Sequence, residues 1–275
     1  MAITRHAVNG IELSVLDEGP ATGELPVLLL HGWPDDHDLW RHQVPALVAA
    51  GHRVIAPDLR GFGASDKPAD VAAYSLLEHF GDLIGLLDAL DAPRVKLVGH
   101  DWGAALAWGL AALAPDRVER LCAISVGHPS AFAAAGLEQV RSSWYFWLFC
   151  HEIAESVIPR DDWVLLDAFG ANPDHDRHRA LLERPGALSA SLGIYRANVS
   201  PEQRYAEQPL EIPPVACPTL GIWSDGDEAL CEAQMTGSAA FATGPWRYER
   251  IAGWGHFVPS EAPEALNPLL FEFLA

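Results

Sequence analysis

Mostly apolar segments alternate with amphipathic ones along the first half of the chain. Four of them have the residue pattern of strands: Pro26–Leu30, Arg53–Pro57, Arg94–Gly99 and Val118–Val126. Pro26–Leu30 is apolar throughout, which indicates burial on both faces. Three segments between these strands have the residue pattern of helices: Leu39–Ala50, Ser75–Leu90 and Gly103–Leu113. This alternation predicts a mostly parallel sheet with helices on both faces, which is the α/β class.

The alternation stops in the middle of the chain. Residues 129–214 are rich in aromatic residues and helix-like, and strand patterns return only at Thr219–Trp223 and Trp246–Ile251, before a closing helix at Pro263–Leu274. A helical insertion between two strands predicts a cap over the carboxyl edge of the sheet, where ligands bind in such folds.

The same pattern sets the domain boundaries that we expect. Residues 1–128 and 215–275 form the two parts of the α/β core, and residues 129–214 form the helical cap, inserted after the sixth strand.

Charge narrows the choice of partners. The chain has 275 residues and carries 18 Lys and Arg against 37 Asp and Glu, a formal net charge of −19. So acidic a surface repels phosphate backbones and anionic lipids, which argues against nucleic acid and membrane partners. No apolar run is as long as a membrane span, and the N-terminal residues lack the apolar core of a signal peptide. The four scattered cysteines indicate reduced core residues, and we expect a cytoplasmic protein.

The segment Val98-Gly99-His100-Asp101-Trp102-Gly103 joins a predicted strand to a predicted helix. Its Gly-x-nucleophile-x-Gly spacing permits a strained turn that projects the central side chain into a cleft. The central residue is Asp101, whose carboxylate can attack a saturated carbon and form an alkyl ester. The alternative is a turn in which Asp101 only caps the helix. Because no Ser stands at this position, a serine esterase is disfavoured.

A second motif, His31-Gly32-Trp33-Pro34, directly follows the strand Pro26–Leu30. The backbone N–H of Trp33 is placed to form an oxyanion hole with the backbone N–H of Trp102, the residue after the nucleophile. Pro34 would stiffen this loop, and we expect His31 and Pro34 to line the substrate pocket.

An acid and a histidine are expected after the nucleophile. His256 lies in a Gly-rich loop just beyond Trp246–Ile251, and Asp227 lies just beyond Thr219–Trp223. In these positions His256 would be the general base for water and Asp227 would orient the imidazole. Asp225 is a rival for the acid, and the sequence separates the two only weakly.

Taken in order, VGHDWG, HGWPDD, APDLRGFGASDKP, GIWSDGDEAL and GWGHF resemble the epoxide hydrolase branch of the α/β-hydrolases, over essentially the whole chain. The resemblance implies an α/β-hydrolase fold, hydrolysis of an epoxide to a vicinal diol, and two cap tyrosines that donate to the epoxide oxygen. Tyr145 and Tyr195 stand in contexts similar to those of the two family tyrosines. The neighbouring Trp144 and Trp147 suggest an apolar, aromatic pocket.

Two other functions stay open. A haloalkane-type dehalogenase uses the same Asp nucleophile, and a hydrolase scaffold can also serve as a non-catalytic ligand-binding protein. Fluoroacetate dehalogenases resemble this chain at Trp144 and Tyr195 but add an Arg just after the nucleophile, which the helix Gly103–Leu113 lacks. We therefore expect a small apolar epoxide and water as partners. Exposed cap aromatics would also be compatible with a homodimer.

Two histidine motifs invite a metal hypothesis. The segment His151-Glu152-Ile153-Ala154-Glu155 begins like a zinc-binding helix but lacks its second His. The charged segment Asp174-His175-Asp176-Arg177-His178 indicates a solvated surface of the cap. We expect no metal and no organic cofactor.

Overall fold

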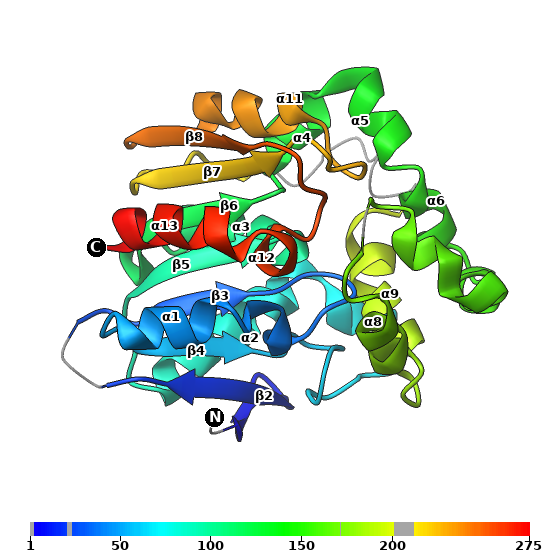
Figure 1. Ribbon diagram of the computed structural model, residues 1–275. Helices are drawn as coiled ribbons and strands as arrows, with labels where there is room; N and C mark the ends of the chain where they lie inside the picture. The colour runs from blue at the N-terminus through cyan, green and yellow to red at the C-terminus, as the bar shows by residue number, and fades with distance from the viewer. Residues whose placement is uncertain (1–2, 21–23, 171, 201–211) are drawn as a thin grey trace.

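The computed structural model describes residues 3–20, 24–170, 172–200 and 212–275 (Figure 1). Within these residues the strands form one eight-stranded sheet in the order β1-β2-β4-β3-β5-β6-β7-β8. β1 and β2 pair antiparallel, β2 pairs antiparallel with β4, and the remaining neighbours are parallel. The strand bounds are Ile3–Val8 (β1), Ile11–Glu18 (β2), Val27–Leu30 (β3), Val54–Pro57 (β4), Val95–His100 (β5), Val118–Ile124 (β6), Thr219–Ser224 (β7) and Trp246–Ile251 (β8).

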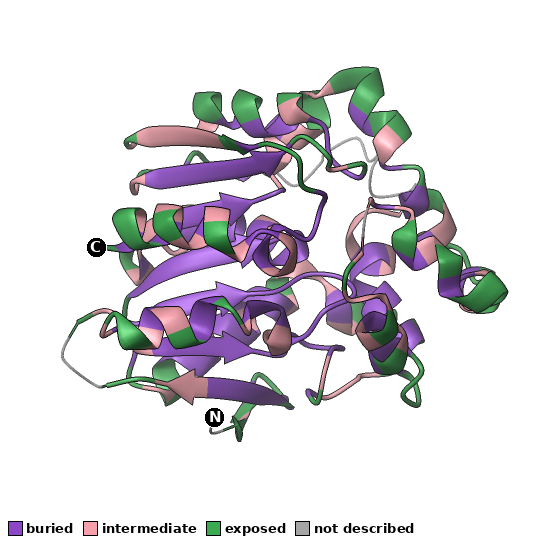
Figure 2. Ribbon diagram, viewed as in Figure 1, coloured by how far each residue is buried: buried purple, intermediate pink, exposed green. Residues whose placement is uncertain are grey.

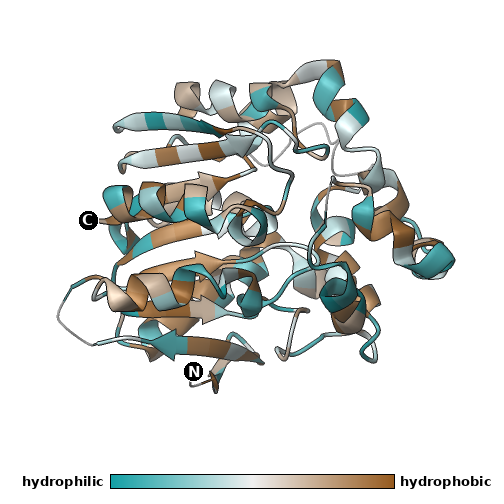
Figure 3. Ribbon diagram, viewed as in Figure 1, coloured by the Kyte–Doolittle hydropathy of each residue, from teal (hydrophilic) through white to brown (hydrophobic). Residues whose placement is uncertain are grey.

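The central strands are buried because helices cover both faces of the sheet. Every residue of β3, β4 and β5 is buried, and Figures 2 and 3 show these strands as the buried, apolar centre of the molecule. One face packs against α2 (Leu76–Ala89) and α3 (Trp102–Leu113). The other face packs against α1 (Gln43–Ala49), α12 (Val258–Glu261) and α13 (Pro263–Leu274). The α/β-hydrolase architecture predicted from the sequence is confirmed.

A group of helices lies between β6 and β7 in the chain, beyond the arrowheads of the parallel strands (Figure 1). These cap helices are α4 (Pro129–Ala134), α5 (Gly136–Ser142), α6 (Tyr145–Cys150), α7 (Ala154–Val157), η4 (Arg160–Asp167), α8 (His175–Leu182) and α9 (Ala187–Asn198). They therefore stand over the carboxyl edge of the sheet. The predicted cap bounds of 129–214 stay a prediction, because residues 171 and 201–211 lie outside the described residues.

Shorter elements complete the core: η1 (His37–Trp40), η2 (Val71–Tyr74), η3 (Pro115–Arg117), α11 (Glu232–Thr236) and η5 (Gly237–Phe241). Within the described part of the chain, no helix combines the length and apolarity that crossing a membrane requires.

Two of the expected elements have different bounds. The single helix expected at Leu39–Ala50 is wrong, because the chain forms η1 and then α1 with a break between them. Pro45 explains the break, since its ring would clash with the carbonyl of Arg41 in a continuous helix. The strand expected to reach Val126 ends at Ile124, because Ser125 has a positive φ of 68° and leaves the extended conformation.

Candidate active site

Asp101 occupies a sharp turn between β5 and α3. Its backbone has φ 53° and ψ −123°, a conformation that residues other than glycine rarely adopt and that costs about 1–3 kcal/mol. Gly103 permits the turn, because a Cβ atom on it would lie 2.0 Å from the carbonyl oxygen of Leu30. The turn predicted from the glycine spacing is present, and it places the carboxylate at the carboxyl edge of the sheet beneath the cap.

Two backbone N–H groups point at the Asp101 carboxylate. The N–H of Trp33, in the loop after β3, donates to Asp101 Oδ1 at 2.8 Å, and the N–H of Trp102 bonds the same carboxylate. The loop approaches so closely that a Cβ atom on Gly32 would lie 2.2 Å from Oδ1. These donors stand where an oxyanion on the side chain of Asp101 would form.

His256 connects Asp101 to a second carboxylate. Its Nε2 lies 3.7 Å from Asp101 Oδ2, and its Nδ1 lies 2.9 Å from Asp227 Oδ2. The other oxygen of Asp227 accepts the N–H groups of Ala229 and Leu230 at 2.9 and 3.0 Å, which fixes the carboxylate toward the imidazole.

Asp225, the rival left open by the sequence, points elsewhere. Its carboxylate accepts the N–H of Gly253 at 2.6 Å and lies 3.3 Å from Arg250. The structure therefore brings Asp227, and not Asp225, to the imidazole of His256.

This difference predicts opposite results for a matched pair of variants. Asp227→Asn removes the charge that faces the imidazole, so we expect kcat to fall by about 10- to 100-fold or more. Asp225→Asn should change kcat by less than about threefold, because only a loop contact is weakened. Steady-state kinetics on the two purified variants measures the difference. Equal losses in both would contradict the assignment of Asp227.

Two residues that the sequence did not reveal hold the His256 loop. His100 Nε2 bonds the backbone carbonyl of His256 at 2.8 Å, and its ring lies 4.8 Å from the imidazole of His256. Glu261 accepts the N–H groups of Gly255 and Phe257 at 2.7 and 2.8 Å. The available signals were a histidine next to the nucleophile and an acid one turn after the loop, and neither specifies a role.

The local charges favour a protonated His256 in the resting protein. Burial lowers the pKa of His256, but the charge and hydrogen bond of Asp227, followed by the charge of Asp101, raise it to about 9. Burial raises the pKa of Asp101, while His256 and the N–H groups of Trp102 and Trp33 lower it in part, and the result is a raised value. Asp101, His256 and Asp227 thus form one buried group whose charges influence one another.

The raised pKa of His256 predicts a pH-dependent stability. Between pH 6.5 and 9 the folded protein retains a proton on His256 that the unfolded chain releases, so stability falls as the pH rises. The expected slope is about 1.4 kcal/mol per pH unit in this window, and it vanishes below pH 6.5, where both states hold the proton. Urea unfolding of the wild type and of His256→Gln measures it. Equal slopes for the two proteins would contradict the raised pKa.

The cap brings two phenols to the site. Tyr195 on α9 packs edge-on against the Trp102 ring at 5.1 Å, and the ring of Tyr145 on α6 lies 6.1 Å from that of Tyr195. Both side chains are buried. Burial, Asp101 and Tyr145 raise the pKa of Tyr195 well above 10. Its hydroxyl is therefore protonated at neutral pH and can donate a hydrogen bond.

An aromatic wall, formed by Trp33, Phe149 and Phe169, adjoins the phenols. The Trp33 ring lies 4.6 Å from Phe149 and 5.8 Å from Phe169, and Phe169 lies 4.9 Å from Tyr145. The indole N–H of Trp33 donates to Ser191 Oγ on α9 at 3.2 Å. Sequence reasoning missed Phe149, Phe169 and Ser191, because an apolar residue in a helical cap resembles any core residue.

Comparisons with known proteins agree with this geometry. The family model for the alpha/beta hydrolase fold matches residues 26–263. Epoxide hydrolase A of Mycobacterium tuberculosis is 30% identical over 97% of this chain and 95% of its own length. The chain belongs to the epoxide hydrolase family of α/β-hydrolases. It is therefore a hydrolase, and not a non-catalytic binding protein on that scaffold.

Other relatives extend the similarity over the whole chain. An AB hydrolase superfamily protein of Bacillus subtilis is 36% identical over 97% of this chain and 95% of its own length. A solved epoxide hydrolase from hot-environment metagenomes has a TM-score of 0.88 at 33% identity, covering 100% of this chain and 98% of its own. Epoxide hydrolase A of Mycobacterium thermoresistibile has a TM-score of 0.85 at 27% identity, covering 99% and 98%.

Three pocket residues expected from the sequence have other environments. Trp144, the N-cap of α6, and Trp147, in its first turn, are 43% and 54% exposed, whereas Tyr145 between them is buried. His31 is fully buried and uses both ring nitrogens, with Nδ1 2.9 Å from the carbonyl oxygen of Gly32 and Nε2 accepting the N–H of Leu59. Pro34 is buried beside Trp33 in the loop at the nucleophile.

The charged segment Asp174–His178 is not a solvated surface. It begins helix α8, and His178 is fully buried against Asp35 with 3.0 Å between Nε2 and Oδ1. Asp174 binds Arg41 of the core through both carboxylate oxygens at 2.8 and 2.9 Å. The segment is partly buried because its charged side chains pair with side chains of opposite charge in the core. The sequence pattern alone does not reveal these pairs.

One group of side chains in the described residues has metal-ligand character. The ligand atoms of Asp36, His37 and Asp58 lie within 4.8 Å of one another. However, Asp58 Oδ1 already bonds both the backbone N–H and the ring of His37, and its other oxygen accepts the N–H of Ala64 at 2.8 Å. These hydrogen bonds give the cluster a structural role in the core loop.

Proposed function

We propose that the enzyme converts an apolar epoxide and water into a vicinal diol through an alkyl ester on Asp101. One observation carries this proposal: the carboxylate of Asp101 accepts the N–H groups of Trp33 and Trp102 on one side, while His256 stands at 3.7 Å and buried Tyr195 faces it from the cap. An acid–base pair, an oxyanion site and a phenol donor thus surround one nucleophile. The names of the relatives support the same activity.

In the first step, an oxygen of Asp101 attacks a ring carbon and the C–O bond of the epoxide breaks. The electron pair of that bond moves to the epoxide oxygen, and Tyr195 and Tyr145 supply hydrogen bonds and a proton to it. The aromatic wall of Trp33, Phe149 and Phe169 excludes water and favours an apolar substituent.

In the second step, water attacks the carbonyl carbon of the ester. His256 accepts the proton of the water, and Asp227 balances the charge of the imidazolium. The N–H groups of Trp33 and Trp102 stabilise the negative charge on the carbonyl oxygen. The ester bond breaks between the acyl carbon and the ester oxygen, and that oxygen takes the proton of the Asp101 carboxylic acid, which releases the diol and restores the carboxylate. A proton from His256 replaces the one that the tyrosine gave to the epoxide oxygen.

The first step prepares the base for the second. In the resting protein the charge of Asp101 contributes to the raised pKa of His256. Esterification neutralises Asp101 and removes this contribution, so the pKa of His256 falls toward the value at which the imidazole is neutral. Esterification therefore makes His256 less basic than in the resting protein, while the larger contributions of Asp227 remain.

In a haloalkane-type dehalogenase the indole N–H of the residue after the nucleophile would donate to the departing halide. The indole of Trp102, which follows the nucleophile, instead hydrogen-bonds the side chain of Tyr195. Since indole nitrogen is a donor only, the phenol oxygen accepts and keeps its own proton free to donate. This arrangement favours an epoxide oxygen as the leaving group.

A mixed panel of epoxides and haloalkanes, scored separately for diol and for halide, tests the reaction. We expect diol from epoxides and no halide release. A single turnover in ¹⁸O-water tests the ester, because the label should enter the Asp101 carboxylate and not the diol. Halide without diol would overturn the proposed substrate class, and label in the first diol would overturn the ester.

A further inference from the structure

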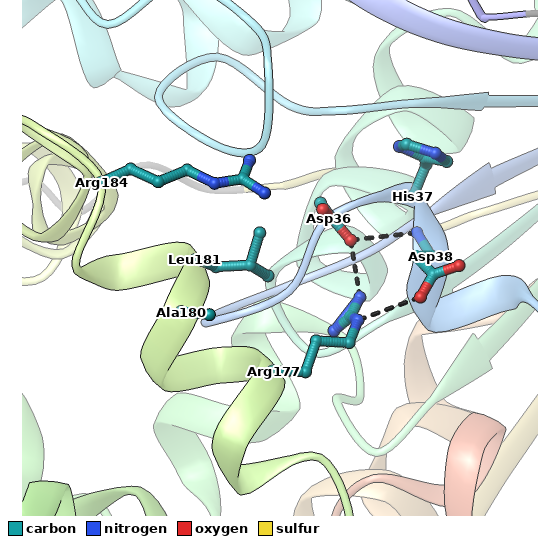
Figure 4. A pocket seen from close by; sticks show the side chains of 7 residues that line it. All are labelled: Asp36, His37, Asp38, Arg177, Ala180, Leu181 and Arg184. Carbon is teal, nitrogen blue, oxygen red and sulfur yellow. Dashed lines mark hydrogen bonds and ion pairs between the residues drawn. The ribbon is translucent and has the colours of Figure 1, made fainter.

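Arg177, on cap helix α8, forms ion pairs with the core loop that carries Trp33. Arg177 contacts three loop carboxylates: Nη1 lies 2.7 Å from Asp35, Nη2 lies 2.6 Å from Asp36, and Nε lies 3.1 Å from Asp38. Figure 4 shows the guanidinium of Arg177 between Asp36 and Asp38, at the edge of a cleft of about 290 Å³ between the cap and the core. We refer to Arg177 and these carboxylates as the Arg177 cluster.

A second buried contact strengthens the cluster. The Asp35 side chain is fully buried and also bonds Nε2 of buried His178 at 3.0 Å. The side-chain partners of Asp35 thus come from two adjacent residues of α8, Arg177 and His178. Without Arg177, three neighbouring and partly desolvated carboxylates would repel one another.

The Arg177 cluster is directly continuous with the oxyanion site. Asp35 lies two residues after Trp33, and its N–H donates to the carbonyl of Gly32 at 3.0 Å, which folds residues 32–35 into a tight turn. That turn directs the N–H of Trp33 at Asp101. A shift of Asp35 therefore shifts the donor, and donor position decides how well an oxyanion is stabilised.

We propose that Arg177 is a positioning residue that holds the N–H of Trp33 in place for hydrolysis of the ester on Asp101. The inference rests on the proposed function, since it assigns the Arg177 cluster to the second step of that reaction. In the first step the negative charge develops on the epoxide oxygen beneath the cap phenols, so the Trp33 donor matters mainly in the second. Docking of α8 and assembly of the oxyanion site are consequently one event.

Rapid-quench kinetics with an epoxide separates the two steps in Arg177→Met. We expect the rate constant for ester hydrolysis to fall by about 10- to 100-fold, while the rate constant for ester formation changes by less than about threefold. The loss in hydrolysis should not exceed the loss caused by removing a whole oxyanion donor. The esterified fraction in the steady state, measured by intact mass, rises accordingly. Equal losses in both steps would overturn the proposal.

Arg41→Met is the matched control. It removes the other arginine–carboxylate pair between α8 and the core, Arg41 with Asp174, and the bond from Arg41 Nη1 to the backbone carbonyl of Asp38, while the contacts of Arg177 with Asp35 and Asp36 remain. We expect both rate constants to stay within about threefold of the wild type. The same selective loss of hydrolysis in this control would show general loosening of the cap and overturn the proposal. If Arg177→Met does not fold, Arg177→Lys should give a smaller loss that is again confined to ester hydrolysis. One ammonium group cannot replace the contacts of the guanidinium with three carboxylates.

Hydrogen exchange gives a readout that does not depend on activity. We expect the amide of Trp33 to exchange faster in Arg177→Met than in the wild type, and to remain unchanged in Arg41→Met. If the wild type forms neither ester nor diol from epoxides, the proposed function fails, while exchange still tests the Arg177 cluster. An unchanged exchange rate at Trp33 in Arg177→Met would overturn the inference even in an active enzyme.

Discussion

His256→Gln is expected to stop the enzyme at the ester. Ester formation needs only the carboxylate of Asp101 and the cap phenols, whereas hydrolysis needs a base at the position of His256 Nε2. Glutamine keeps a polar side chain of similar reach but cannot accept the proton of water. We expect kcat to fall by about 10²–10⁴-fold, the usual contribution of a general base.

The covalent adduct is the decisive measurement for this variant. After exposure to an epoxide, the intact mass should rise by the mass of one substrate molecule, and fragmentation should locate the addition on Asp101. The double variant Asp101→Asn/His256→Gln is the control, and it should remain unmodified. An unmodified His256→Gln protein, with diol formation abolished, would contradict the proposed order of events.

Removal of both cap hydroxyls should prevent the first step. In Tyr145→Phe/Tyr195→Phe the rings remain packed, but the epoxide oxygen must leave as an unassisted alkoxide. One preorganised donor contributes about 10²–10³-fold, so we expect ester formation to slow by about 10³–10⁴-fold in the double variant. Each single variant should lose less, because the other phenol remains.

The His256→Gln background isolates this effect. There the accumulation of the ester reports ester formation alone, and the two tyrosine substitutions can be added to it. Tyr248→Phe is the matched control, because its hydroxyl bonds Glu232 at 2.7 Å, away from Asp101. Ester formation at the parental rate in the double tyrosine variant would remove the phenols from the mechanism.

The sequence predicts the core of this fold well, because its strands have a simple pattern. The run Val27–Leu30 is fully buried in the sheet and requires apolar side chains at every position. Asp101 and His256 could also be found, since glycine-rich turns directly after strands mark the carboxyl edge of a parallel sheet. Periodicity and turn chemistry are local properties, and local properties can be read from one chain.

The cap is less predictable, because its contacts join residues far apart in the chain. Trp144 and Tyr145 are neighbours in sequence, yet one is 43% exposed and the other 4%. Arg177 belongs to a segment whose composition indicates a solvated surface, and only the three acids of the core loop account for its burial. Such pairing depends on how α8 docks, which no single segment encodes.

The cap helices are inserted in the chain at one place, between β6 and β7. One contiguous stretch of sequence therefore carries both phenols and two of the three residues of the aromatic wall. We expect substrate preference to change when this stretch is exchanged with that of a relative, while Asp101, Asp227 and His256 stay in place. The exchange has a condition. The exchanged cap must contain counterparts of Arg177 and Ser191, because both residues contact the core loop that carries Trp33.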